Sequence, residues 1–283
     1  MTGAPFSRKA PPRRREGYGS RLSFAVGLAL TLAIATFLIL PAILSMLAGV
    51  TVNYFRGLSS GLTLRWVGEV LALYSDTLML TLGLAMATLA TTLVLGVPAA
   101  WYLVRNPSRT SRAIEELLTL PIAVPGLAIA LALILVFGGL GDLRRSWVFI
   151  LIGHVLFTLP FMVRAVAANL HAIDARTLEE GAAALGAGPW RRFIDVIVPN
   201  ARPGILAGAL MVTTLSVGEF NLTWMLHTPL TKTLPVGLAD AYASMRLEVA
   251  SAYTLVFFVM IIPLLVAIQW LGGLGAPGGR ARR

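Results

Sequence analysis

Cysteine is absent from the 283-residue sequence, so disulfides, thiolate metal sites and a catalytic thiol are all excluded. Charged residues are also scarce at 13%, whereas hydrophobic residues make up 57% and the mean hydropathy is +0.80. A soluble domain carries about twice this share of charged residues. The composition therefore predicts an all-α polytopic membrane protein.

The sequence also lacks the Gly-x-x-x-x-Gly-Lys-Ser/Thr loop that cradles nucleotide phosphates in many ATPases. Its three histidines, His154, His171 and His227, are widely spaced and form no metal-binding pattern. No Ser/His/Asp arrangement stands out either. We therefore expect no catalytic residue, no metal site and no cofactor on this chain, and no enzyme activity.

The charge balance is strongly basic, with a formal net charge of +10. The basic residues lie in loops and tails beside apolar segments, which is how membrane topology is encoded. We therefore expect contact with a lipid bilayer and none with nucleic acid. Each apolar segment is long enough to cross about 30 Å of hydrocarbon as a helix. The six predicted transmembrane helices cover residues 22–50, 77–104, 117–141, 147–163, 203–226 and 249–271.

Lysine and arginine are distributed unevenly between the two sides of this arrangement. Of the 23 basic residues, 17 lie on the side of both termini and 6 in the opposite loops. The positive-inside rule places the richer side in the cytoplasm. The predicted organisation is a disordered basic tail at 1–21, a six-span domain at 22–275 and a cytoplasmic Gly/Arg tail at 276–283. The segment 22–50 is too long for the apolar core of a cleaved signal peptide, so a retained anchor is expected.

The loop 174–203 is rich in ionisable side chains, each of which would cost at least ~2.5–3.5 kcal/mol at the centre of a bilayer. It therefore lies in water or against another protein. Asp174 suits a helix N-cap, and Leu178, Ala182 and Leu185 recur at helical spacing. The residues that separate and end two short helices are Gly186, Gly188, Pro189, Pro199 and Pro203. This helix–turn–helix between apolar spans predicts a docking element.

The spacing inside the loop is also informative. Glu180-Gly181-Ala182 is followed by Gly186 and, after nine intervening residues, by Val-Ile-Val and Pro199. This resembles the EAA loop of ABC-importer permeases, whose pattern is Glu-Ala-Ala, three residues, Gly, nine residues and Ile-x-Leu-Pro. Gly181 stands where the family usually has Ala, which loosens the helix by up to ~1 kcal/mol. The alternative is an ordinary cytoplasmic hairpin between two spans.

The resemblance implies a type I ABC importer permease with the MetI-like fold, in the bacterial inner membrane with both termini cytoplasmic. Such a permease forms half of a translocation pore. The implied partners are ATPase subunits that bind the ATP, a second identical or homologous permease, and an extracytoplasmic substrate-binding protein. The residues that the resemblance assigns to ATPase docking are Glu179, Glu180, Gly181, Ala182, Leu185, Gly186 and Pro199.

Further stretches bear on the substrate. Gly218-Glu219-Phe220-Asn221, the later Thr-Leu-Pro-Val and the Leu-Pro-Ile-Ala-Val-Pro-Gly run at 120–126 resemble permeases for polyamines, ferric iron, thiamine or aminoethylphosphonate. We favour a small polar solute such as a polyamine, while the other three solutes remain alternatives. A secondary transporter driven by an ion gradient is a further alternative. It is disfavoured because Glu219 is the one acidic residue predicted inside a span.

Glu219 lies in the predicted fifth span, where an intramembrane carboxylate is a functional hypothesis by default. Thr223 is four residues on and shares its helical face, and Asn221 lies between them. One interpretation assigns these three residues to the translocation pathway. The other is that Glu219 pairs with a basic group or lies at the membrane surface. The sequence leaves both open.

Overall fold

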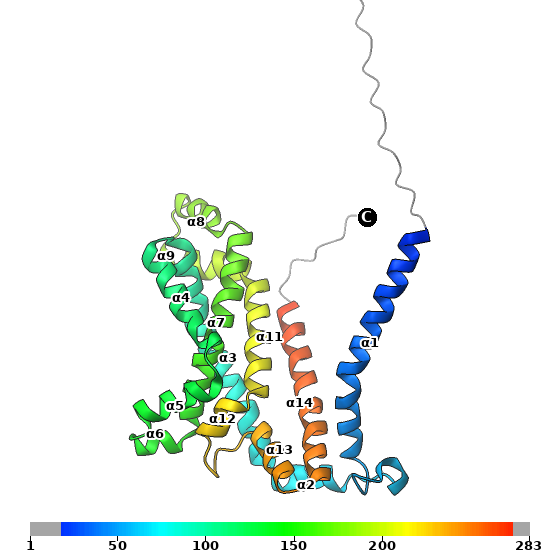
Figure 1. Ribbon diagram of the computed structural model, residues 1–283. Coiled ribbons are helices and arrows are strands. Elements are labelled where there is room, and N and C mark those ends of the chain that lie inside the picture. Colours follow the sequence, from blue (N-terminus) through cyan, green and yellow to red (C-terminus); the bar gives the residue numbers. More distant parts are fainter. Residues whose placement is uncertain (1–17, 274–283) are drawn as a thin grey trace, which may run out of the picture. The chain divides into compact units, whose positions relative to one another are not determined.

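The computed structural model describes residues 18–273, and every regular element within that range is a helix (Figure 1). The expectations for the tail residues 1–17 and 276–283 lie outside the described residues. The first helix starts at Tyr18, so the end of the predicted disordered tail is helical. The elements are α1 (Tyr18–Ala48), η1 (Gly57–Ser60), α2 (Arg65–Leu73), α3 (Ser75–Arg105), α4 (Arg109–Ala123), α5 (Gly126–Phe137), α6 (Gly141–Arg145), α7 (Trp147–Ala172), α8 (Ala175–Ala184), α9 (Pro189–Arg191), η2 (Arg192–Ile197), α10 (Val198–Asn200), α11 (Arg202–Gly218), α12 (Asn221–Leu226), α13 (Leu234–Ala243) and α14 (Leu247–Gly273).

The chain divides into two compact units, residues 1–45 and 46–283. The first contains most of α1, a continuous apolar helix. In the second, α3, α7 and α14 are also long and apolar enough to cross a membrane. Two bent helix pairs bring the number of candidate spans in the described residues to as many as six. The all-α polytopic fold predicted from the sequence is confirmed.

The predicted third span is not a continuous helix. α4 and α5 meet at 107°, with the bend at Val124 and Pro125. Proline has no N–H to donate, and its ring pushes the preceding residue into extended backbone. Val124 has φ −92° and ψ 130°, as this steric effect requires.

The other spans depart from prediction at their ends. The fourth extends to Ala172, so Arg164 lies within α7 instead of at its end. The fifth stops at Gly218, and Glu219 has extended backbone before α12 begins. The segment 227–248 between the last two predicted spans contains α13, which has Pro235 in its first turn.

The centre of the second unit is the packing of α3, α7 and α11 against one another. Small residues allow close approach: a Cβ at Gly208 would lie 2.7 Å from the sulfur of Met162, and one at Gly204 would lie 2.8 Å from the carbonyl oxygen of Ala165. Helices in lipid associate through such close packing because apolar surface gains little by leaving lipid. Threonine hydroxyls in α3 donate to carbonyls one turn earlier, as Thr88 does to Leu84, so they are satisfied within the helix.

In Figure 1, α8 and α9 lie at one end of this bundle, and α2 and α13 at the other. The α8 end is built on a core of α3, α7 and the segment 192–201, centred on Met162, Val166 and Ile197. The opposite end has a separate core in which Tyr253 of α14 packs with Val70 and Leu234. Polar side chains that link several elements are found towards both ends.

Candidate functional site

α8 is a short helix with well-defined ends. Asp174 precedes it as predicted, but has left-handed backbone with φ 47°, and its carboxylate accepts the Thr177 hydroxyl at 2.6 Å. At the other end Gly186 has φ 83°, and its N–H donates to the Ala183 carbonyl. The N–H of the next residue donates to Ala182, which completes a Schellman motif. Only glycine adopts this backbone without strain, so the predicted break at Gly186 has a physical cause.

The second helix of the predicted helix–turn–helix is divided. Pro189 starts α9 at its first turn, as predicted, and a π-helix follows before α10. Pro199 lacks an N–H and its ring crowds the carbonyl four residues earlier, at Asp195. A widened π turn at this position accommodates both effects.

The α8 segment buries a charged side chain and exposes apolar ones, the reverse of the usual arrangement on a protein surface. Glu179 is only 5% exposed, whereas Leu185 is 91% exposed and Leu178 is 38% exposed. Ala175, one turn before Glu179, is also buried, so the two residues mark the face that packs against the subunit. The sequence shows the spacing of these residues, but it does not show which face of the helix is covered.

The Glu179 carboxylate joins three elements. Its Oε1 is 3.2 Å from Nε of Arg105 at the end of α3 and 3.2 Å from Nη1 of Arg192 in η2. Its Oε2 accepts a hydrogen bond from the Trp101 indole at 3.1 Å. That indole lies 4.8 Å from the ring of Phe193, centre to centre. We call Glu179, Arg105, Arg192 and Trp101 the Glu179 clamp.

A polar cavity of about 450 Å³ adjoins the clamp. Its lining includes Arg105, Arg192, Arg176 and both Glu179 and Glu180. Arg176 and Glu180 pair at 2.9 Å on the solvent side, where the two side chains are 67% and 66% exposed. Of the two adjacent glutamates, one is therefore buried and internally paired, and the other is available to a partner.

The remaining predicted docking residues lie on or beside the exposed side of α8. Gly181, Leu185 and Gly186 are exposed, and a Cβ at Gly181 would meet no atom within 4 Å. Ala182 and Pro199 are partly buried. Trp190, which the sequence did not single out, is 74% exposed in the same segment.

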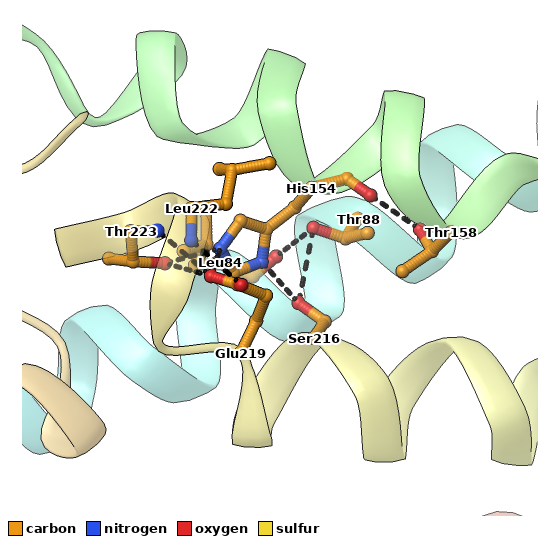
Figure 2. A network of polar contacts seen from close by, with 8 residues as sticks. All are labelled: Leu84, Thr88, His154, Thr158, Ser216, Glu219, Leu222 and Thr223. Atoms are coloured by element: carbon orange, nitrogen blue, oxygen red, sulfur yellow. Dashed lines mark hydrogen bonds and ion pairs between the residues drawn. The ribbon is translucent and has the colours of Figure 1, made fainter. Parts of the chain in front are cut away.

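The second candidate site is at the break between α11 and α12 (Figure 2). The Glu219 carboxylate accepts the N–H of Leu222 and the N–H of Thr223, both at 2.8 Å, and the Thr223 hydroxyl at 2.9 Å. The predicted shared helical face of Glu219 and Thr223 is wrong, because Glu219 lies outside both helices. The two side chains meet because the carboxylate satisfies the free N–H groups at the start of α12.

The Glu219 carboxylate connects to a buried hydrogen-bond network. Nε2 of His154 lies 2.8 Å from the Thr223 hydroxyl, and Nδ1 lies 2.9 Å from the Ser216 hydroxyl. A carboxylate only accepts, so the Thr223 proton points at Glu219 and Nε2–H donates to Thr223. Nδ1 then accepts from Ser216, whose oxygen is 3.4 Å from that of Thr88 on α3. We call these five residues the Glu219 network.

The start of α5 also lies at this network, next to the break between α11 and α12. A Cβ at Gly126, the first residue of α5, would lie 3.5 Å from Oε1 of Glu219. Thr223 is fully buried, whereas Asn221 is exposed. Of the three predicted pathway residues, the structure brings Glu219 and Thr223 into contact and leaves Asn221 outside the network.

A family model for the binding-protein-dependent transport system inner membrane component matches residues 92–277. The chain belongs to this family. It is therefore a multi-pass inner-membrane permease of a binding-protein-dependent ABC importer. This assignment excludes the alternative of a secondary transporter driven by an ion gradient.

Known proteins with similar sequences are also permeases of transport systems. The chain is 34% identical over 202 residues to the molybdenum transport system permease protein of Azotobacter vinelandii, covering 66% of this chain and 88% of the relative. It is 26% identical to a putative 2-aminoethylphosphonate transport system permease of Salmonella choleraesuis, over 88% and 96% of the two chains. Other relatives are named for sulfate and putrescine transport. All are transport permeases, which agrees with the expectation that the chain is not an enzyme.

The fold has a solved counterpart. A chain of the MetNI methionine ABC transporter, in an inward-facing conformation, matches with a TM-score of 0.56 at 18% identity. The match covers 70% of this chain and 92% of that chain. At this identity the likeness concerns the fold, and it confirms the predicted MetI-like architecture.

Proposed function

We propose that this chain docks an ATPase subunit through the exposed face of α8 and forms half of the translocation pore. The observation that carries the proposal is the reversed polarity of α8, with Glu179 buried and Leu185 91% exposed. A helix that only covered its own subunit would bury the leucine and solvate the carboxylate. An exposed apolar side chain at the glycine-capped end of a helix suits a partner surface.

Within the coupling loop the residues divide by role. Glu180, Gly181, Ala182, Leu185 and Gly186 form the proposed contact surface. Glu179 and Pro199 are proposed to hold that surface in shape from behind. The ATP is bound by the ATPase subunit, so this chain needs no cofactor of its own.

The complete importer then contains two permeases, identical or homologous, two ATPase subunits and an extracytoplasmic binding protein. The excess of basic residues supports a cytoplasmic location for α8 and both termini. The binding protein would deliver solute at the end formed by α2 and α13. Closure of the ATPase dimer would move the two coupling helices and switch the side on which the pore is open.

For the transported solute we infer a small oxyanion. A polyamine would be favoured by a free intramembrane carboxylate, but Glu219 accepts three hydrogen bonds from α12. Few of its lone pairs remain for an ammonium group. Relatives named for sulfate and 2-aminoethylphosphonate transport support the inference. The relative named for molybdenum transport does so too, since molybdenum in neutral water is a tetrahedral oxyanion. A polyamine remains the second candidate, supported by the relative named for putrescine.

Docking is tested by co-purification of the ATPase with the Leu185→Asp permease. We expect the amount of bound ATPase to fall by about tenfold or more, because a charge would be buried at the interface. Leu230→Asp is the matched control, since Leu230 is 93% exposed in the loop before α13. Undiminished ATPase binding by Leu185→Asp would refute docking at α8.

The solute is tested with membrane vesicles that contain the complete transporter. Labelled molybdate, sulfate and putrescine are offered separately, with and without ATP and the binding protein. We expect saturable ATP-dependent uptake of an oxyanion. Uptake of putrescine alone would overturn this inference and leave the docking proposal intact.

A further inference from the structure

We propose that Glu179 is a positioning residue that transmits the displacement of α8 to α3. The inference rests on the proposed function, because α8 is displaced only if an ATPase docks on it. It concerns a step that docking alone does not explain. A surface helix that moves with the ATPase changes the pore only if it is firmly attached to a membrane-spanning helix.

The clamp provides that attachment. Among the described residues, Glu179 forms the polar contacts between α8 and α3, one to Arg105 and one to Trp101. A third contact, to Arg192, holds η2 to the same carboxylate. The three donors come from two separate parts of the chain, so one side chain joins α3, α8 and η2.

The physical character of the clamp makes it stiff. The Glu179 side chain is 7% exposed and that of Arg192 is 16% exposed, so this pair is screened little by water. Arg105 is 38% exposed, so its ion pair with the same carboxylate is screened more. Separating a buried carboxylate from its guanidinium groups leaves uncompensated charge, which strongly opposes motion of one element without the other. The exposed pair of Arg176 and Glu180 has no such effect, because water replaces either partner.

The α3 helix leads from the clamp to the second site. Arg105 is its last residue, and Thr88, in the middle of the same helix, lies beside Ser216 in the Glu219 network. At helical rise the two positions are about 25 Å apart along the axis. A displacement of the end of α3 therefore reaches the broken helices α11 and α12 through one continuous element.

The two ion pairs of the Glu179 clamp can be removed one at a time by substitution. Arg105→Gln removes the charged tie to α3 and leaves the tie between α8 and η2. Arg192→Gln does the reverse. The same substitution at Arg112, which is exposed on the neighbouring helix α4, is the matched control. Arg105→Lys retains the charge and tests whether the charge alone suffices.

The experiment uses the complete transporter reconstituted in proteoliposomes. Three quantities are measured for each variant: ATPase bound per permease, ATP hydrolysed, and solute taken up per ATP. The solute is whichever one the vesicle assay identifies. We expect Arg105→Gln to bind the ATPase normally but to lower solute per ATP by about three- to tenfold. This is the range for losing one ordinary hydrogen bond, because the Arg105 side chain is 38% exposed, which weakens its charged contact. Arg105→Lys should restore part of the ratio, and Arg112→Gln should leave it unchanged.

Three outcomes would overturn the proposal. The first is an unchanged ratio of solute to ATP in Arg105→Gln at normal ATPase binding. The second is loss of ATPase binding in Arg105→Gln, which would mean that the clamp only shapes the docking surface. The third is a larger loss of coupling in Arg192→Gln than in Arg105→Gln. Failure of docking at α8 itself would be recognised separately, by normal ATPase binding in Leu185→Asp.

Discussion

Glu179 and Glu219 are two carboxylates with almost the same burial, at 7% and 8% side-chain exposure, yet their charges are compensated by different means. Glu179 is paired with two guanidinium groups from separate elements. Glu219 accepts two backbone N–H groups and one hydroxyl, all from the first turns of α12. The first arrangement joins distant parts of the chain, whereas the second shapes the chain locally.

The difference follows from the surroundings of each residue. Near the α8 end, long arginine side chains on α3 and η2 bring their charge to the buried carboxylate of Glu179. Around Glu219 the structure describes no arginine or lysine in contact, and the available donors are the unpaired N–H groups at a helix start. A broken helix supplies these donors without any cation. The break in the fifth span therefore stabilises the carboxylate that marks it.

The α8 end and the end formed by α2 and α13 should face opposite sides of the membrane, and cysteine labelling tests this in an all-or-none manner. Ser59→Cys, in η1, should react completely with a thiol reagent that does not cross the membrane. Thr110→Cys, at the start of α4, should not react until the membrane is opened. The sequence contains no native cysteine to interfere. Labelling of Thr110→Cys in intact membranes would place the α8 end outside and refute docking there.

The largest energetic effect is expected for Glu179→Gln. Without the carboxylate, Arg105 and Arg192 face each other across a neutral amide. We expect a loss of about 2–4 kcal/mol in the free energy of unfolding, less than for a fully enclosed pair because Arg105 is 38% exposed. Thermal unfolding of the purified permease measures this loss of stability, and Glu116→Gln on the exposed side of α4 is the control. Equal melting temperatures for both variants would show that the Glu179 clamp does not stabilise the folded permease.

Glu219→Gln should have a smaller effect. The amide has one acceptor oxygen in place of two, and its NH₂ group would point at the N–H donors of α12. We expect a loss of about 1–3 kcal/mol from one or two broken hydrogen bonds, and uptake that falls only as far as the amount of folded permease does. Asn221→Ala, at an exposed position of the same turn, should leave stability unchanged.

The same experiment decides between the two interpretations of Glu219 that the sequence leaves open. Reduced uptake by Glu219→Gln at full stability and full complex yield would assign the carboxylate to the translocation pathway. A parallel loss of stability and uptake would assign it to the structure of the break. The proposed oxyanion substrate is consistent with the second result.

The sequence predicted the class, the short helix that ends at Gly186 and most of the span positions because these depend on local patterns. Docking of an ATPase on the loop 174–203 stays a prediction. The length of an apolar run predicts a membrane span. Gly186 can adopt the left-handed backbone that ends a helix, and Pro189 suits the first turn of one. The two breaks were harder to predict. Pro125 was visible inside an apolar run, but nothing local says that the chain turns by 107° there. The stop at Glu219 depends on donors supplied by α12 after the chain has folded.

The clamp was missed for a related reason. Trp101 and Arg105 lie near the end of the predicted second span, where aromatic and basic side chains are common in any membrane protein. This pattern is local, while the common partner of the two residues is Glu179, about 75 residues further on. The available signal was the pair of adjacent glutamates in the middle of α8. Neighbouring positions on a helix point about 100° apart, so the two glutamates could not share one environment.

The smallest effect on stability is expected at the second of these glutamates. Glu180 pairs with Arg176 at 2.9 Å, a shorter distance than either ion pair of Glu179, but both side chains are about two-thirds exposed. Water and salt screen such a pair, so Glu180→Gln should change the free energy of unfolding by no more than about 0.5 kcal/mol. Thermal unfolding of Glu179→Gln and Glu180→Gln, measured together at low and high salt, tests this difference in stability.

If the two variants are destabilised equally, burial does not distinguish the adjacent carboxylates, and the assignment of one to the clamp and the other to the partner surface fails. A large difference that persists in high salt would show that the distance between charges matters less here than the water around them.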